Sequence, residues 1–277
     1  MPSQLLSPVF QPTFRSNFPA ASMPRMRLTV AYDGRPYAGW QSQPSGLTVQ
    51  DMLEVAIAKI LPQHFLRVLG SGRTDAGVHA LGQVLHFDPP EEGSPPPEAW
   101  QRALNVHLPP SIRVMESRWV GNTFHARFDA VGKTYRYRIW TGQVLPPFEA
   151  GLALHHPRAL DMPLLKAACG EVAGTHDFTN FAAFRGNEDG SEDNTRTIWS
   201  VTPAIESEVV TLTFHGSGFL YKMVRLLTGA ILRVATGREP LTWLTDLVHR
   251  RVPGKCAHVA PAAGLYLVAV HYPDGTL

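Results

Sequence analysis

Short stretches in which apolar and polar residues alternate recur along the chain, and stretches with apolar residues at helical spacing lie between them. Residues 26–32 alternate in this way, which predicts a strand with one buried face. Thr48 is a favourable helix N-cap, and the apolar residues of 49–61 fall on one helical stripe that Pro62 ends. The same patterns predict further strands over residues 65–69, 82–87, 112–120, 134–140, 197–201, 209–214 and 265–270. They predict further helices over residues 97–106, 162–172 (after Asp161 as the cap), 217–235 and 240–250.

This mixture of strands and helices, with apparent hairpins, favours an α+β fold over a doubly wound parallel sheet. A length of 277 residues suggests about two domains. We expect an N-terminal α+β domain over residues 25–120 and a C-terminal α+β domain over residues 121–277. Residues 1–24 contain five prolines and no acidic residue, so we expect a disordered extension rather than a secretory signal, or a chain start at Met23 or Met26.

Composition narrows the class of protein without naming a partner. The 25 Lys and Arg residues against 23 Asp and Glu residues leave a net charge of only +2. No apolar stretch approaches the 18 or so residues of a membrane span, so we expect no membrane partner. Cys169 and Cys256 are far apart, which argues against a disulfide framework and favours a cytoplasmic location.

The charge is unevenly distributed, because residues 113–138 and 209–238 are rich in Lys and Arg. The first of these segments also carries aromatic residues, and cations combined with aromatic rings are typical of RNA binding. The alternative is that the rings belong to the core and the arginines to the solvent face of ordinary strands.

The segment 70–79, GSGRTDAGVH, is the best candidate for chemistry. Its glycines match neither a dinucleotide-binding fingerprint nor a phosphate-binding P-loop. It offers a carboxylate, Asp75, with a possible counter-charge on Arg73 two residues earlier. An anionic aspartate on such a loop can act as a nucleophile or a base. From the pattern alone, a structural Asx-turn with Arg73 in a surface ion pair is the better explanation. No spacing of His or Cys residues indicates a metal site.

Several motifs in order resemble those of tRNA pseudouridine synthases of the TruA type. The segment 72–79, GRTDAGVH, resembles the catalytic signature of that family. The other matching motifs are AYDG (31–34), YAGWQ (37–41), FHARF (124–128), KTYRY (133–137), FLYKMVR (219–225) and GLYLV (264–268). They cover nearly the whole chain after residue 24, and together they are far more specific than any one of them.

The resemblance implies a fold and an activity. The fold would be the pseudouridine synthase fold, with two α+β halves whose antiparallel or mixed sheets join around a central basic cleft. The enzyme would isomerise uridine to pseudouridine in the anticodon stem-loop of tRNA, at positions 38 to 40. It would act as a homodimer and use neither a cofactor nor a metal.

The resemblance also implies roles for individual residues. Asp75 would be the essential aspartate, Arg225 would pair with it, and Tyr135 would stack on the target base and take part in removing the C5 proton. Arg73 and Leu265 would help to bind the substrate. Further RNA contacts are expected from Phe124, His125, Ala126, Arg127, Phe128, Arg196 and Lys222.

The chain departs from the family pattern in an acidic segment over residues 186–194 and in the pair Tyr221-Lys222, where relatives often carry two histidines. Two other functions are open at this point. One is a non-catalytic tRNA-binding protein or chaperone on the same fold. The other is a glycoside hydrolase, for which Asp33 is the only candidate for the required second carboxylate.

Overall fold

The computed structural model describes residues 24–183, 193–250 and 254–273, and these residues form an α+β fold around one mixed sheet. The strands are β1 (Arg25–Tyr32), β2 (Leu69–Gly70), β3 (His79–Phe87), β4 (Ile112–Val120), β5 (Gly132–Trp140), β6 (Leu154–His155), β7 (Gly174–Asp177), β8 (Thr195–Glu206), β9 (Val209–Gly216) and β10 (Leu265–His271). The helices are α1 (Val49–Ile60), α2 (Pro97–His107), α3 (Met162–Glu171), α4 (Met223–Ala235) and α5 (Leu241–Val248).

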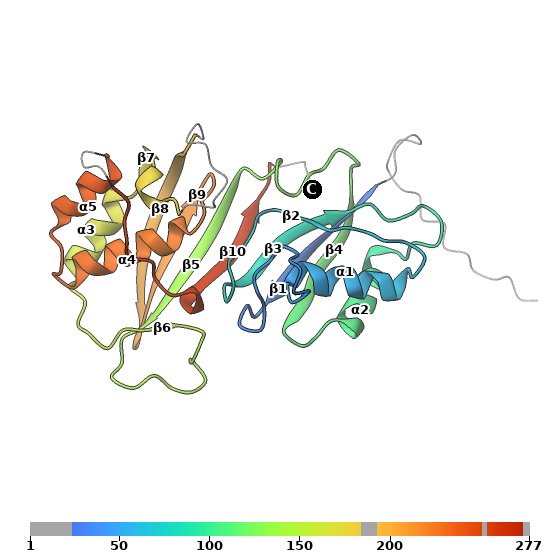
Figure 1. The fold of residues 1–277 in the computed structure, drawn as a ribbon, viewed down its shortest axis with the longest axis horizontal. Helices are drawn as coiled ribbons and strands as arrows, with labels where there is room; N and C mark the ends of the chain where they lie inside the picture. The colour runs from blue at the N-terminus through green and yellow to red at the C-terminus, as the bar shows by residue number, and fades with distance from the viewer. Residues whose placement is uncertain (1–23, 184–192, 251–253, 274–277) are drawn as a thin grey trace, which may run out of the picture.

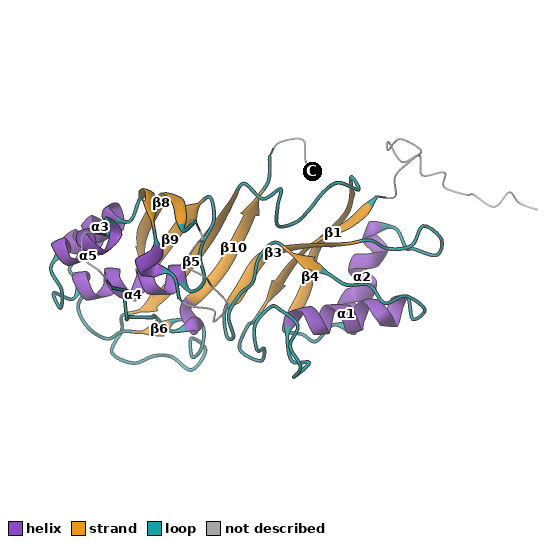
Figure 2. Cartoon of the chain, turned by 45° about the horizontal axis from the view of Figure 1, so that its top comes forward, coloured by secondary structure: helices purple, strands orange, loops and turns teal. Residues whose placement is uncertain are grey.

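The strand order is β4-β1-β3-β10-β5-β9-β8-β7, with β2 added beside β3 and β6 beside β5. Neighbours along this path are antiparallel except for β3 and β10, which are parallel. Figures 1 and 2 show α1 and α2 at one end of the sheet and α3, α4 and α5 at the other, with β5 and β10 between them. The expected α+β class is confirmed.

The last strand joins the two ends of the sheet. Leu267 in β10 pairs with Ala80 in β3 on one side and with Tyr135 in β5 on the other. The expected boundary after residue 120 falls between β4 and β5, and the division into two domains stays a prediction. The extension expected over residues 1–24 lies outside the described residues, apart from Pro24.

One large apolar core lies between the helices and the sheet. Helix α1 begins at the predicted cap, because Thr48 and Asp51 form a reciprocal capping box. Ten of the 13 residues of helix α4 are buried, so this helix is part of the core. A second, small cluster consists of Val84, Val120, Phe124, Ala126 and Tyr272.

Several predicted elements were wrong in extent. The strands expected over residues 82–87 and 197–201 are longer, at His79–Phe87 and Thr195–Glu206. The strand expected over residues 65–69 is reduced to Leu69–Gly70, and Phe65 is 81% exposed, so its apolar side chain has no sheet face to cover. The helix expected from residue 217 begins only at Met223, because Lys222 adopts a left-handed conformation with φ of 58° that interrupts a helix. Strands β6 and β7 were not predicted, since two to four residues carry too little periodicity.

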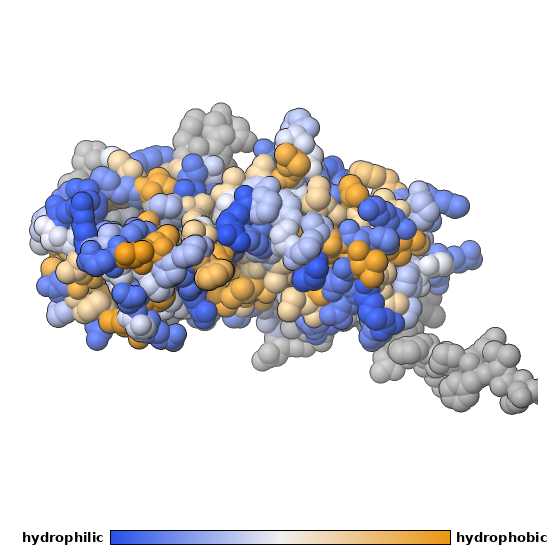
Figure 3. Space-filling model, turned by 90° about the horizontal axis from the view of Figure 1, so that it is seen from below, coloured by the Kyte–Doolittle hydropathy of each residue, from blue (hydrophilic) through white to orange (hydrophobic). Residues whose placement is uncertain are grey.

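Figure 3 shows hydrophilic residues over much of the face seen from below, with hydrophobic residues scattered among them. In the part of the chain that the structure describes, no helix is both long and apolar enough to cross a membrane.

Candidate active site

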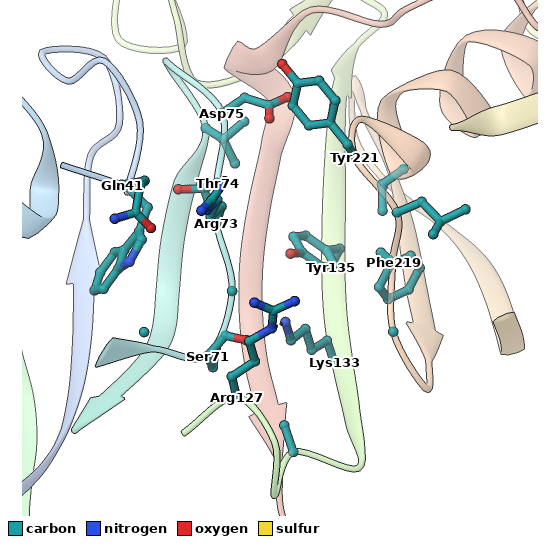
Figure 4. A pocket seen from close by; sticks show the side chains of 18 of the residues that line it. Gln41, Ser71, Arg73, Thr74, Asp75, Arg127, Lys133, Tyr135, Phe219 and Tyr221 are labelled. Carbon is teal, nitrogen blue, oxygen red and sulfur yellow. Dashed lines mark hydrogen bonds between the residues drawn. The ribbon is translucent and has the colours of Figure 1, made fainter. Parts of the chain in front are cut away.

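A cavity of about 1340 Å³ lies where the two ends of the sheet meet. The loop between β2 and β3 forms one wall, and the segment between β9 and α4 forms another. Strand β5 contributes Lys133 and Tyr135 between these walls, as Figure 4 shows. Leu265, at the start of β10, also lines the cavity. Segments far apart in the sequence therefore enclose one space.

Asp75 forms an ion pair with an arginine from the other end of the sheet. Nη1 of Arg225 in α4 donates to Oδ2 of Asp75 at 2.7 Å. The side chain of Asp75 is only 18% exposed and that of Arg225 only 15%, so water screens this ion pair less than it screens a pair on the surface. Nε of Arg225 donates to the carbonyl oxygen of Ala260 at 2.8 Å, which fixes the plane of the guanidinium group. The contact that the resemblance implied between Asp75 and Arg225 is present.

The residue before Asp75, Thr74, is held by β1 and by the turn that follows it. The amide of Trp40 donates to the carbonyl oxygen of Thr74 at 3.1 Å, and the hydroxyl groups of Thr74 and Tyr32 are 2.8 Å apart. Gly39 has φ of 101°, and a Cβ atom there would lie 2.7 Å from the carbonyl oxygen of Thr74. The YAGWQ motif therefore needs its glycine because the loop that carries Asp75 packs directly on it.

Tyr135 is buried beside this pair. Burial raises the pKa of its phenol above the ordinary value, and the charges of Tyr32 and Asp75 raise it further. Its ring makes an edge contact with that of Phe219, with centroids 5.1 Å apart. The phenol therefore keeps its proton at neutral pH, where it offers a flat ring and a hydroxyl donor rather than a phenolate base.

Comparison with known proteins decides the family. A model described as tRNA pseudouridine synthase matches residues 28–129 and 168–273 of this chain. A protein named tRNA pseudouridine synthase A from Akkermansia muciniphila is 50% identical over 258 residues, which cover 92% of this chain and 97% of that protein. Proteins of the same name from Latilactobacillus sakei and Anoxybacillus flavithermus are 43% and 42% identical over 90% and 91% of this chain, and over 98% and 100% of their own lengths. This chain belongs to the tRNA pseudouridine synthase family.

In this synthase, Arg73 does not pair with Asp75, and its expected role in substrate binding stays a prediction. It is exposed, it lines the cavity, and it makes no hydrogen bond or ion pair within residues 24–183, 193–250 and 254–273. The counter-charge on Asp75 comes from Arg225 instead. Arg73 is therefore free to meet an anion from outside.

The residues expected to contact RNA fall into two groups. His125, Arg127, Phe128, Arg196 and Lys222 line the cavity. The side chains of Phe124 and Ala126 do not, because both are buried in the small cluster beside β3 and β4. They hold the FHARF segment in place, and the RNA contacts that we propose for this segment come from its other side chains.

His86 also supports the FHARF segment. Its Nδ1 accepts a hydrogen bond of 3.1 Å from the amide of Ala126, and the residue is fully buried. Burial lowers the pKa of His86 to about 4, and the charges of Arg25 and His125 add to the effect. Sequence analysis placed His86 in a predicted strand but did not reveal this contact with the FHARF segment.

Lys133 is the site residue whose role the sequence did not reveal, although it opens the KTYRY motif. Its Nζ donates to the carbonyl oxygen of Ser71 at 2.9 Å. Burial, together with the charge of Arg127, lowers the pKa of Lys133 to about 8. One feature of the sequence could have indicated this role. Lys133 stands two residues before Tyr135, and side chains two residues apart on a strand lie on the same face of the sheet.

Asp33, the second carboxylate that a glycoside hydrolase would need, lies outside the residues that line the cavity. It pairs with Arg35 at 2.6 Å instead. Among the described residues, no group of three or more His, Cys, Asp or Glu side chains is placed to hold a metal ion. Residues 186–192 of the acidic segment lie outside the described part of the chain.

Proposed function

We propose that this protein isomerises uridine to pseudouridine at positions 38 to 40 in the anticodon stem-loop of tRNA, with Asp75 as the catalytic carboxylate. Its family membership makes it a pseudouridine synthase, which is an isomerase with tRNA as its substrate. The anticodon site, the catalytic role of Asp75, action as a homodimer and a cytoplasmic location are the finer parts of the proposal.

The observation that carries the proposal is the Asp75–Arg225 pair inside a cavity that also holds a buried tyrosine. The reaction breaks the bond from the ribose C1′ to N1 of the base and forms a bond from C1′ to C5. The C5 proton leaves and N1 gains a proton, so the atoms balance without an oxidant, a reductant or a phosphate donor. A carboxylate suffices to start this exchange, either as a nucleophile or as a base.

We infer the roles of the remaining side chains from their positions in the cavity. The target uridine has to leave its stack to reach Asp75, and we assign the ring of Tyr135 to stacking on it. Leu265 packs against the base from β10. Arg225 orients the carboxylate of Asp75. Arg73, Arg127, Arg196 and Lys222 neutralise phosphates, while His125 and Phe128 offer rings for unpaired bases.

Release of tritium from tRNA labelled at C5 of uridine tests the catalytic role. We expect the D75A variant to release none while it binds tRNA nearly as well as the wild-type protein, because removing a carboxylate does not weaken a phosphate contact. D33A is the matched control and should release tritium at the wild-type rate. Persistent release by D75A would refute the role of Asp75, and no release by the wild-type protein would favour a non-catalytic tRNA-binding protein. Mapping pseudouridine in the product tRNA tests the positions.

A further inference from the structure

Lys133 links the catalytic loop to the middle strand of the sheet. It stands two residues before Tyr135 on β5, and both side chains line the cavity (Figure 4). The hydrogen bond from its Nζ reaches the carbonyl oxygen of Ser71, four residues before Asp75. Lys133 thus contacts the start of the loop that carries the catalytic carboxylate.

The other bonds at the start of this loop all come from β3. The amide of Ser71 donates to the carbonyl oxygen of Val84 at 2.8 Å, and the Ser71 hydroxyl donates to Oε1 of Gln83 at 2.6 Å. Nε2 of Gln83 donates to the carbonyl oxygen of Gly72 at 2.9 Å. The bond from Lys133 comes from β5 instead, so it ties the start of the loop to the strand that carries Tyr135.

Gly72 leaves the space that the ammonium group occupies. A Cβ atom at Gly72 would lie 2.4 Å from Nζ of Lys133 and 3.7 Å from its Cε. This notch fits the small head of a lysine. A planar guanidinium group, which is larger, does not fit the same space without moving the loop.

An ammonium group has three hydrogens, and the carbonyl of Ser71 takes one of them. No other described residue accepts from Lys133. Its charged neighbour is Arg127, which is also a cation. Lys133 is partly buried while Arg127 is exposed. A partly desolvated ammonium group beside a second cation is unfavourable, and a phosphate entering the cavity would relieve this cost.

We propose that Lys133 is a positioning residue that holds the carbonyl of Ser71 with one hydrogen and a backbone phosphate of the bound RNA with the others. Binding of RNA and placement of the Asp75 loop are thereby coupled through one side chain. The inference rests on the proposed function for the identity of its ligand.

The variants K133M and K133R separate the two contacts, and K166M is the matched control, because Lys166 is an exposed residue of α3. Two quantities are measured with tRNA: the single-turnover rate of pseudouridine formation at saturating enzyme, and the dependence of Kd on salt. We expect K133M to lower the rate about tenfold or more and to reduce the salt slope by roughly 0.7 to 0.9, the value of one phosphate contact. K133R should keep the slope, because its charge remains, but lose rate, because its head does not fit beside Gly72.

A pH series adds a readout that a merely structural lysine would not move. Above pH 8 the amine of Lys133 still donates to Ser71 but loses its charge, so the tRNA affinity of the wild-type protein should fall more steeply between pH 7 and 9 than that of K133R. The other ionisable groups around the cavity are present in both proteins and cancel in the comparison. They are Arg67, Arg73, Asp75, His125, Arg127, Tyr135, Arg196, Tyr221, Lys222 and Arg225.

The outcomes distinguish this inference from the proposed function. If the wild-type protein forms pseudouridine and K133M matches K166M in rate and in salt slope, the role of Lys133 is overturned and the function stands. If the wild-type protein neither binds tRNA nor forms pseudouridine, the proposed function falls, and the inference falls with it.

Discussion

Asp75 and Arg225 are 150 positions apart in the sequence and are joined by a hydrogen bond of 2.7 Å between Nη1 and Oδ2. The aspartate lies on a loop before β3, and the arginine lies near the start of α4. The same arginine is tied to the chain segment before β10 through the carbonyl of Ala260. The pair therefore depends on the correct assembly of both ends of the sheet.

The first prediction concerns this arginine. R225K should lower the single-turnover rate of pseudouridine formation about 100-fold, the usual scale for losing one preorganised charged donor. A lysine has one point charge and cannot hold Ala260 and Asp75 together in a fixed plane. R233K is the control, because Arg233 lies on the same helix and pairs with Glu239 away from the cavity. Equal rates for the two variants would contradict the role of Arg225.

The second prediction concerns Arg127, which lines the cavity beside Lys133. If its guanidinium group contacts a phosphate, R127A should weaken tRNA binding and lower the slope of log Kd against log salt concentration by roughly 0.7 to 0.9. The exposed Arg102 of α2 lies far from the cavity lining, so R102A should leave the slope unchanged. Filter binding over a range of salt concentrations measures both. An unaltered slope in R127A would mean that this side chain does not contact the RNA backbone.

Features that depend on neighbouring residues were predicted from the sequence, and features that depend on distant segments were not. The strands β1 and β4 and the capped helix α1 were predicted almost to the residue, because alternation and capping are encoded within a few neighbouring positions. Motif resemblance identified Asp75 and Arg225 together. Nothing in residues 70–79 alone distinguishes Arg73 from a more distant arginine as the partner of Asp75, because that choice depends on how α4 packs.

Burial was harder to predict than secondary structure. In the FHARF segment, Phe124 is 2% exposed and Phe128 is 74% exposed, although both are phenylalanines in one short motif. The segment belongs to no helix or strand, so no periodicity indicates which side chains face inward. Phe124 is buried because it belongs to the small cluster that includes Tyr272, a residue near the other end of the sequence.

The third prediction concerns the stability of the fold in acid. His86 has a lowered pKa of about 4 in the folded protein against 6.5 for an ordinary histidine, so below pH 6.5 the unfolded chain binds more protons than the folded one. The contribution of His86 to stability is therefore present above pH 6.5 and is lost as the pH falls towards 4. Between pH 7 and 5 the loss should be about 2 kcal/mol.

Urea unfolding at pH 7 and pH 5 measures this loss. H86Q removes the titrating ring, so its free energy of unfolding should fall less over the same interval. The exposed His64 supplies the control, because H64Q should retain the pH dependence of the wild-type protein. If the free energy of unfolding of H86Q depended on pH as strongly as that of the wild-type protein, the acid sensitivity would belong to another group.

The fourth prediction compares two glycines in helices. A Cβ atom at Gly229 in α4 would lie 1.9 Å from the carbonyl oxygen of His258, whereas a Cβ atom at Gly170 in α3 would meet nothing within 4 Å. G170A should therefore stabilise the protein by about 0.5 to 1 kcal/mol, the ordinary helix preference for alanine. G229A should destabilise it by about 2 kcal/mol or more, because backbone atoms have to move apart.

The same two variants also test the geometry around Arg225. The segment that approaches Gly229 continues to Ala260, and the carbonyl oxygen of Ala260 accepts a hydrogen bond from Arg225. Pushing this segment away from α4 should shift the guanidinium group and slow tritium release in G229A, while G170A should remain fully active. Urea unfolding and the release assay, applied to both variants, separate a loss of stability from a loss of geometry. If G229A is unstable but its folded fraction is fully active, the hydrogen bond from Arg225 to Ala260 does not set the position of the Asp75–Arg225 pair.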